Sequence, residues 1–135
     1  IDILKECGPS LIQADPLSNL LFSVHMWWPV MWGYSAERVK REIAESVSME
    51  LPLIVGEFGN AWEETEEGAI PWRTIIEECH SNEIGWFAWS WGPGNTPQRW
   101  LNMTKDGTFN TLYGWGLEVA VKSPYGIKKT SVRIW

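Results

Sequence analysis

The sequence has only two cysteines among its 135 residues, Cys7 and Cys79. Both fall on apolar positions of helical patterns, where a buried free thiol is commoner than a disulfide in a chain with two cysteines. We therefore expect both thiols to be buried and unbridged. They offer no metal site, and we expect no cofactor.

Long apolar runs and clusters of basic residues are also missing. No run approaches the roughly 20 apolar residues of a membrane-spanning helix, so we expect no membrane partner. The net charge is −6, and the Lys and Arg residues are scattered, which argues against a phosphate-binding surface and against nucleic acid as a partner. The start at Ile1 has neither an initiator Met nor a signal-peptide pattern, so the sequence leaves the localisation open.

Tryptophan, in contrast, is abundant, with 11 residues in the chain. Its flat, bulky side chain fills cores and interfaces, and it also stacks on the C–H faces of sugar rings. The periodicity of the sequence indicates that about half of these residues serve plain packing.

Three short apolar segments predict buried strands at residues 19–25, 51–57 and 84–91. Their near-continuous hydrophobicity is typical of parallel strands that are covered on both faces. A leading helix is expected over residues 1–13, interrupted near Gly8 and Pro9. Each strand is followed by a helical pattern. The predicted apolar stripes are Ala36, Val39, Ile43 and Val47 after a Ser35 cap, Trp72, Ile75, Ile76 and Cys79 after Pro71, and Leu112, Trp115 and Val119 near Gly114 and Gly116.

This alternation of strands and helices predicts an α/β fold with a parallel sheet and right-handed crossovers. The strand-end residues His25, Glu57 and Trp89 are 32 residues apart each time, a period that suits a (β/α)8 barrel. Three strands cannot close a barrel of eight. We therefore expect a single domain over residues 1–135 that forms part of a barrel, about three and a half βα units. The alternative is a self-contained three-stranded α/β domain, whose exposed strand edges would need covering.

Alternation along the strands predicts which side chains reach the barrel axis. The predicted inward sets are Leu21, Ser23 and His25, then Leu53, Val55 and Glu57, then Phe87, Trp89 and Trp91, whereas Phe22, Val24, Ile54, Trp86 and Ala88 should pack under the helices. An acid, an imidazole and two indoles would then emerge together at the C-terminal ends of three strands, where barrel enzymes build their sites. A structural salt bridge could also explain Glu57 alone, but His25 and Trp89 at matched positions favour a functional carboxylate.

Three sequence motifs in this order resemble strands six, seven and eight of glycoside hydrolase family 5. They are Ser23-Val24-His25-Met26, Ile54-Val55-Gly56-Glu57-Phe58-Gly59 and Trp86-Phe87-Ala88-Trp89-Ser90-Trp91. Residues 14–19 and 114–116 resemble the bacterial β-mannanases and cellulases of that family, so the similarity covers essentially the whole chain. The resemblance implies the C-terminal part of a (β/α)8 TIM barrel and a retaining endo-β-1,4-glycanase, mannanase or cellulase, which is secreted if it follows the family.

The resemblance also implies roles for individual residues. Glu57 matches the catalytic nucleophile, His25 matches a histidine that lines the subsite where the bond breaks, and Trp89, together with Trp91, matches the aromatic platform under that sugar. Trp27 stands where the family usually has a tyrosine that hydrogen-bonds the nucleophile, and it offers only an indole N–H.

The family's general acid/base, an Asn-Glu pair at the end of the fourth strand, has no counterpart in this sequence. One of Glu63, Glu64, Glu66 and Glu67 could in principle act as the acid, but four glutamates around a turn are more often solvated. We therefore expect the 135 residues alone to be inactive, because a retaining mechanism needs two carboxyl groups about 5–5.5 Å apart.

The expected partners are a β-1,4-linked polysaccharide or oligosaccharide and either the missing N-terminal barrel portion or another copy of the chain. Two other functions remain open. One is a non-catalytic polysaccharide-binding module, and the other is a half-barrel that works only after assembly with a complementary chain. Trp28, Trp32, Trp62 and Trp100 lie in loop-like stretches after strands, where each is either a contact for an outer sugar or a loop anchor.

Overall fold

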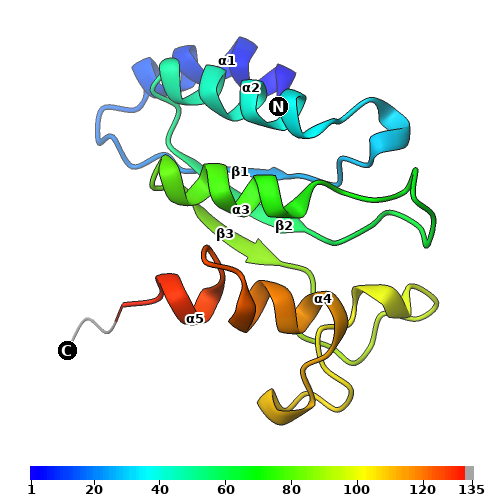
Figure 1. Ribbon diagram of the computed structural model, residues 1–135. Coiled ribbons are helices and arrows are strands. Elements are labelled where there is room, and N and C mark those ends of the chain that lie inside the picture. The colour runs from blue at the N-terminus through cyan, green and yellow to red at the C-terminus, as the bar shows by residue number, and fades with distance from the viewer. Residues whose placement is uncertain (133–135) are drawn as a thin grey trace.

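The computed structural model describes residues 1–132, so Trp135 lies outside the described part. Three parallel strands, β1 (Phe22–His25), β2 (Leu53–Phe58) and β3 (Gly85–Ala88), form one sheet in the order β1-β2-β3 (Figure 1). All three predicted strands are present, but β1 and β3 are shorter than expected. β2 is the central strand, because it pairs with β1 on one side and with β3 on the other.

The helices follow the strands as the sequence patterns predict. They are α1 (Asp2–Ala14), α2 (Ala36–Ser48), α3 (Trp72–Ser81), α4 (Gly114–Leu117) and α5 (Ile127–Thr130), with 3-10 turns at Val30–Trp32, Arg99–Leu101 and Phe109–Thr111 and a π-helical turn at Glu118–Lys122. The Ser35 hydroxyl accepts a hydrogen bond from the Arg38 N–H at 3.2 Å and so caps α2, as predicted. Within residues 1–132, no helix is long and apolar enough to cross a membrane.

The hydrophobic core lies between the sheet and the helices that cover one of its faces. Val39 and Ile43 from α2 and Ile75 from α3 are fully buried, and they belong to one cluster with Val24 and Val55 of the sheet. Complete burial of one such side chain contributes about 1.5–3 kcal/mol, so this cluster dominates the stability of the described part. The predicted stripe of α3 is confirmed in full. Val47 in α2 is an exception, because Ser46 rather than Val47 faces the core in the last turn.

The opposite face of the sheet is uncovered. Leu21 and Phe87 are each 62% exposed there, although both are large and apolar. The outer strands β1 and β3 also each pair on one side only within the described residues.

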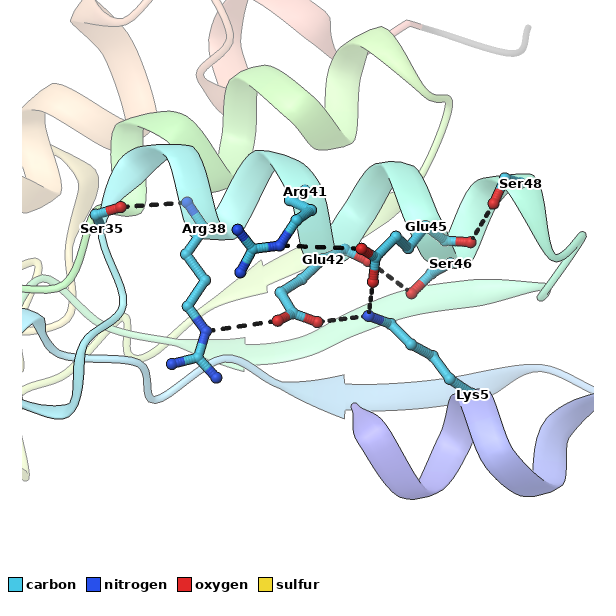
Figure 2. Close-up of polar contacts among 8 residues, drawn as sticks. All are labelled: Lys5, Ser35, Arg38, Arg41, Glu42, Glu45, Ser46 and Ser48. Carbon is cyan, nitrogen blue, oxygen red and sulfur yellow. Dashed lines mark hydrogen bonds and ion pairs between the residues drawn. The ribbon is translucent and has the colours of Figure 1, made fainter.

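A charged cluster joins α1 to α2 (Figure 2). The Lys5 ammonium lies 2.5 Å from a carboxylate oxygen of Glu42 and 2.5 Å from one of Glu45, and Arg38 contacts the second oxygen of Glu42 at 3.5 Å. Burial of Glu42 acts to raise its pKa, but the bonds from Lys5 and Arg38 outweigh burial and hold that pKa below its ordinary value. Glu42 is therefore stabilised in its charged form.

Two expectations for the first helix were wrong. α1 runs unbroken from Asp2 to Ala14 with Pro9 inside it, although a proline removes one helical hydrogen bond. Packing compensates for this loss, because a Cβ at Gly8 would come within 2.7 Å of Leu51, so the glycine lets the helix lie close to the body. Cys7 is exposed and lines a hollow beside β1, whereas Cys79 is buried as expected, and burial raises the pKa of its thiol to about 12.

Candidate active site at the strand ends

The loops that follow the three strands leave the sheet on the same side, at the right of Figure 1. This arrangement follows from the parallel order of the strands, which places their C-terminal ends along one edge. His25 is the last residue of β1, and its Cα pairs with that of Glu57 near the end of β2. The structure therefore brings together the imidazole and the carboxylate that the sequence placed at matched strand ends.

A β-bulge in β2 sets the direction of Glu57. Val24 pairs with Val55, but the next residue, His25, pairs with Glu57, so Gly56 is an extra residue in β2. A Cβ at residue 56 would overlap the Ser23 hydroxyl and would lie 3.2 Å from the His25 ring, which explains why glycine occupies this position.

The bulge overturns part of the predicted alternation. Leu53 and Val55 are 9% and 1% exposed and pack in the helix-covered core, and so they do not share the face of Glu57. Simple alternation assumed an unbroken strand, and the extra residue shifts the pattern by one position before Glu57. For β3 the predicted alternation agrees with the burial, since Phe87 is exposed and Trp86 packs edge-on against Phe58, with their ring centroids 5.6 Å apart.

One carboxylate oxygen of Glu57 contacts both the indole of Trp27 and the imidazole of His25. Trp27 donates its indole N–H to Oε2 at 3.1 Å, and Nδ1 of His25 lies 3.4 Å from the same oxygen. Trp27 thus supplies a hydrogen bond to Glu57 at the position where the resemblance implies a tyrosine hydroxyl. Gly59 makes room for this indole, because a Cβ at residue 59 would approach the Trp27 ring to 2.6 Å. The Glu57 side chain is 28% exposed, so it remains accessible from the open side of the sheet.

The indoles of Trp89 and Trp91 lie beyond the end of β3, and the following loop fixes both of them. Trp91 donates its N–H to the Gly107 carbonyl at 2.7 Å, and Trp89 donates its N–H to Oδ1 of Asn95 at 3.0 Å. The rings themselves stay 42% and 40% exposed for Trp89 and Trp91. Trp89 lines a pocket together with Trp27, whereas Trp91 lines a separate hollow along β3 with Trp86 and Phe87.

A small amide network orients Asn95, and no sequence pattern predicted it. Oδ1 of the buried Asn102 accepts the backbone N–H of Asn95 at 3.2 Å and its side-chain N–H at 2.7 Å. A backbone N–H can only donate, so the Asn102 atom that it contacts must be the oxygen. That oxygen also accepts from the side-chain nitrogen of Asn95, which leaves Oδ1 of Asn95 to accept the indole N–H of Trp89. Gly92, with a φ of 63°, gives Asn102 its space, since a Cβ at residue 92 would lie 2.8 Å from the Asn102 Oδ1.

A pocket of about 270 Å³ continues from this site along the loops, and both Trp27 and Trp89 line it together with Trp62 and Trp100. Trp28, in contrast, is 7% exposed and stacks on Tyr34, with their ring centroids 4.7 Å apart, so it is a loop anchor rather than a ligand contact.

The acidic cluster after β2 lies on a neighbouring pocket, which shares Ala61 and Trp100 with the first one. Glu63, Glu64 and Glu66 line a different pocket of about 590 Å³, whose lining includes neither Glu57 nor the indoles at the strand ends. Glu64, Glu66 and Glu67 are exposed. Within residues 1–132, no group of His, Cys, Asp and Glu side chains is arranged to hold a metal ion.

Comparison with curated proteins finds mannan-degrading relatives. The chain is 30% identical over 128 residues to the mannan endo-1,4-beta-mannosidase of Salipaludibacillus agaradhaerens, covering 95% of this chain and 40% of the relative. It is 31% identical over 113 residues to the beta-mannanase/endoglucanase A of Caldicellulosiruptor saccharolyticus, covering 84% of this chain and 8% of the relative. The chain thus spans well under half the length of these relatives.

Solved structures share the fold over nearly the whole chain. The beta-mannanase from Streptomyces thermolilacinus with mannohexaose superposes with a TM-score of 0.81 at 28% identity and covers 96% of this chain and 40% of its own. The beta-mannanase from Thermomonospora fusca gives a TM-score of 0.82 at 27% identity and covers 97% of this chain and 41% of its own. The predicted fold class is confirmed, because the chain forms the C-terminal part of a (β/α)8 barrel. The family described as cellulase (glycosyl hydrolase family 5) matches residues 7–95, and the chain belongs to that family.

Proposed function

We propose that these residues supply the nucleophile and the sugar platform of a retaining endo-β-1,4-glycanase. The observation that carries the proposal is the Glu57 carboxylate at a strand end, held through Oε2 by Trp27 and His25. A hydrogen-bonded carboxylate that is also open to solvent has the orientation and the access that a nucleophile needs. The exposed ring of Trp89, which lines one pocket together with Trp27, suits the C–H face of a sugar.

In the proposed reaction, Glu57 attacks the anomeric carbon and forms a glycosyl ester while the bond to the leaving oxygen breaks. The leaving oxygen takes a proton from a second carboxylic acid. That group, now a carboxylate, removes a proton from water, which attacks the anomeric carbon and releases Glu57. The hydrogen bond from Trp27 and the nearby His25 imidazole keep Oε2 in position, so that Oε1 faces the substrate.

We propose that the second carboxylic acid is not among the described residues. The two hollows that adjoin His25 and Trp27 are lined by no other carboxylate side chain. We propose that the acid comes from strands that complete the barrel. The unpaired sides of β1 and β3 and an apolar hollow of about 860 Å³ along β3 support this proposal, because further strands of the same barrel would cover them.

We propose β-1,4-mannan as the substrate, because several curated relatives carry that activity in their names and a solved neighbour holds mannohexaose. Cellulose is the second candidate, since one relative is named as both a mannanase and an endoglucanase.

The test uses a complete barrel in which strands one to five of a mannanase relative precede these 135 residues. We expect Glu57→Ala to lower hydrolysis of mannan by about 1,000-fold or more. Added azide should restore turnover of an activated substrate and yield a glycosyl azide of inverted configuration, because the small anion occupies the vacated space. Glu64→Ala, an exposed carboxylate after the same strand, is the matched control and should keep full activity.

Two results would contradict this assignment. Rescue with retained configuration would show that Glu57 is not the nucleophile. Robust hydrolysis by the isolated 135 residues would place the acid within the chain and direct attention to Glu63, Glu64, Glu66 and Glu67.

A further inference from the structure

Gly56 stands directly before the proposed nucleophile, and it has no part in the proposed reaction. We propose that Gly56 is a positioning residue for Glu57: the space beside its Cα holds the His25 ring against the carboxylate, and the Ser23 hydroxyl makes glycine necessary there. This inference rests on the proposed function and extends it from the reacting carboxylate to the backbone that carries it.

The bulge in β2 is present against both neighbouring strands. Val55 and Glu57, two residues apart in β2, pair with consecutive residues of β1. Between Val55 and Phe58, β2 likewise uses one residue more than the facing stretch of β3. In such a bulge, two consecutive residues oppose a single residue of the neighbouring strand. Gly56 and Glu57 therefore both oppose His25.

The His25 ring contacts both residues of the bulge. Its Nδ1 lies 3.4 Å from Oε2 of Glu57. Its opposite edge lies over Gly56, because a Cβ added there would come 3.2 Å from both Cδ2 and Nε2 of the ring. The missing side chain of Gly56 therefore leaves the space in which the ring can turn Nδ1 toward the carboxylate.

Ser23 fills the rest of the space beside Gly56. It lies two residues before His25 on the same exposed side of β1, and a Cβ at residue 56 would overlap its hydroxyl oxygen. The hydroxyl is thus the nearer obstacle to a side chain at residue 56, and the His25 ring is the second. An alanine there would push the ring or the strand aside, and either movement would shift Glu57 relative to its substrate.

Gly85 in β3 provides a matched control. A Cβ at residue 85 would meet only the side chain of Ile54, at 3.5 Å, which is an ordinary van der Waals contact. Gly85→Ala therefore changes a strand glycine of the same sheet without pressing on His25.

The experiment measures kcat and KM for mannan in the complete barrel. Gly56→Ala should lower kcat by at least about tenfold and change KM by less than about threefold, because it displaces the nucleophile and leaves the sugar-binding indoles in place. The loss in kcat caused by Gly56→Ala should be at least about fivefold smaller in a Ser23→Ala background, since the nearer obstacle is then removed. Gly85→Ala should keep kcat within about twofold of the parent.

Azide separates positioning of the nucleophile from a general disturbance of the fold. In the Glu57→Ala barrel the added anion replaces the carboxylate, so the orientation of residue 57 no longer matters. Adding Gly56→Ala to that barrel should therefore change the azide-dependent rate by less than about twofold.

Three results would overturn the inference: full activity of Gly56→Ala, an equal loss in the Ser23→Ala background, or an equal loss in the azide-dependent rate. The proposed function would still stand if Glu57→Ala abolished hydrolysis and azide restored turnover. If Glu57→Ala kept its activity, the proposed function would fail together with this inference.

Discussion

The two faces of the sheet differ in their exposure and in the side chains that they carry. On the helix-covered face, Val24, Val55 and Phe58 are at most 8% exposed and pack against apolar side chains of the helices. On the open face, His25 and Glu57 approach each other, and Phe87 is 62% exposed. The covered face therefore provides stability, while the open face provides polar geometry and aromatic surface. An exposed set of large apolar residues usually marks a surface that another part of the protein covers.

The largest expected effect separates the faces within a single segment. Trp86→Ala in the complete barrel should lower the free energy of unfolding by about 3 kcal/mol, because Trp86 packs against Phe58 on the covered side. Trp89→Ala, three residues later, should leave that free energy nearly unchanged and weaken oligosaccharide binding by about 1–3 kcal/mol. Urea unfolding and calorimetry measure the two quantities. If both variants lost stability and bound the oligosaccharide equally well, the two faces of the sheet would not have separate roles.

A smaller effect is expected at Asn95, which acts on the open face only through Trp89. Asn95→Ala removes the acceptor for the Trp89 indole and should weaken hexaose binding by about 1 kcal/mol, the net value of one hydrogen bond. In a Trp89→Ala background the same change should have no further effect on binding. Additive losses in this double-mutant cycle would show that Asn95 contributes to binding independently of Trp89.

The smallest effect concerns the outer helix layer and its response to pH. The pKa of Glu42 is lowered in the folded state from its ordinary value of 4.5, so its contribution to stability is present above that value and is lost as the pH falls through the lower folded value. Glu42→Gln should lower stability by about 1 kcal/mol at pH 7 and flatten the fall in stability below about pH 4.5.

Glu45→Gln is the control for this pH response, since Glu45 also bonds Lys5 but its side chain is 50% exposed. Its effect should be smaller than that of Glu42→Gln. Chemical unfolding of the complete barrel between pH 3 and pH 7 gives both curves. An equal acid response in the parent and in Glu42→Gln would show that this cluster does not couple to folding.

The sequence predicted the order of elements and the core-facing stripes of the main helices well, because apolar periodicity follows directly from burial, but it assigned Leu53 and Val55 of β2 to the wrong face. The α3 stripe and the Ser35 cap are examples. It also predicted that His25 and Glu57 end neighbouring strands, since the βα period fixes which residues reach one edge of a parallel sheet.

Three features could not be predicted, because each depends on contacts between distant segments. The bulge at Gly56 arises where β2 packs against Ser23 and His25 of β1, and the alternation of residues within one strand does not predict it. The continuity of α1 through Pro9 depends on packing against Leu51. The bond from Asn95 to Trp89 depends on a loop whose course is set by Asn102, and an isolated asparagine in a Gly-Pro turn has no distinctive pattern.

The half-paired strands also affect how these residues behave when they are produced alone. β1 and β3 each present backbone N–H and C=O groups along one side, next to large apolar side chains such as Leu21 and Phe87. Such edges are templates for strand addition from other chains. At high concentration, assembly of the isolated 135 residues into a barrel would therefore compete with aggregation. The yield of soluble protein would then measure how well an added complementary segment pairs with both strand edges.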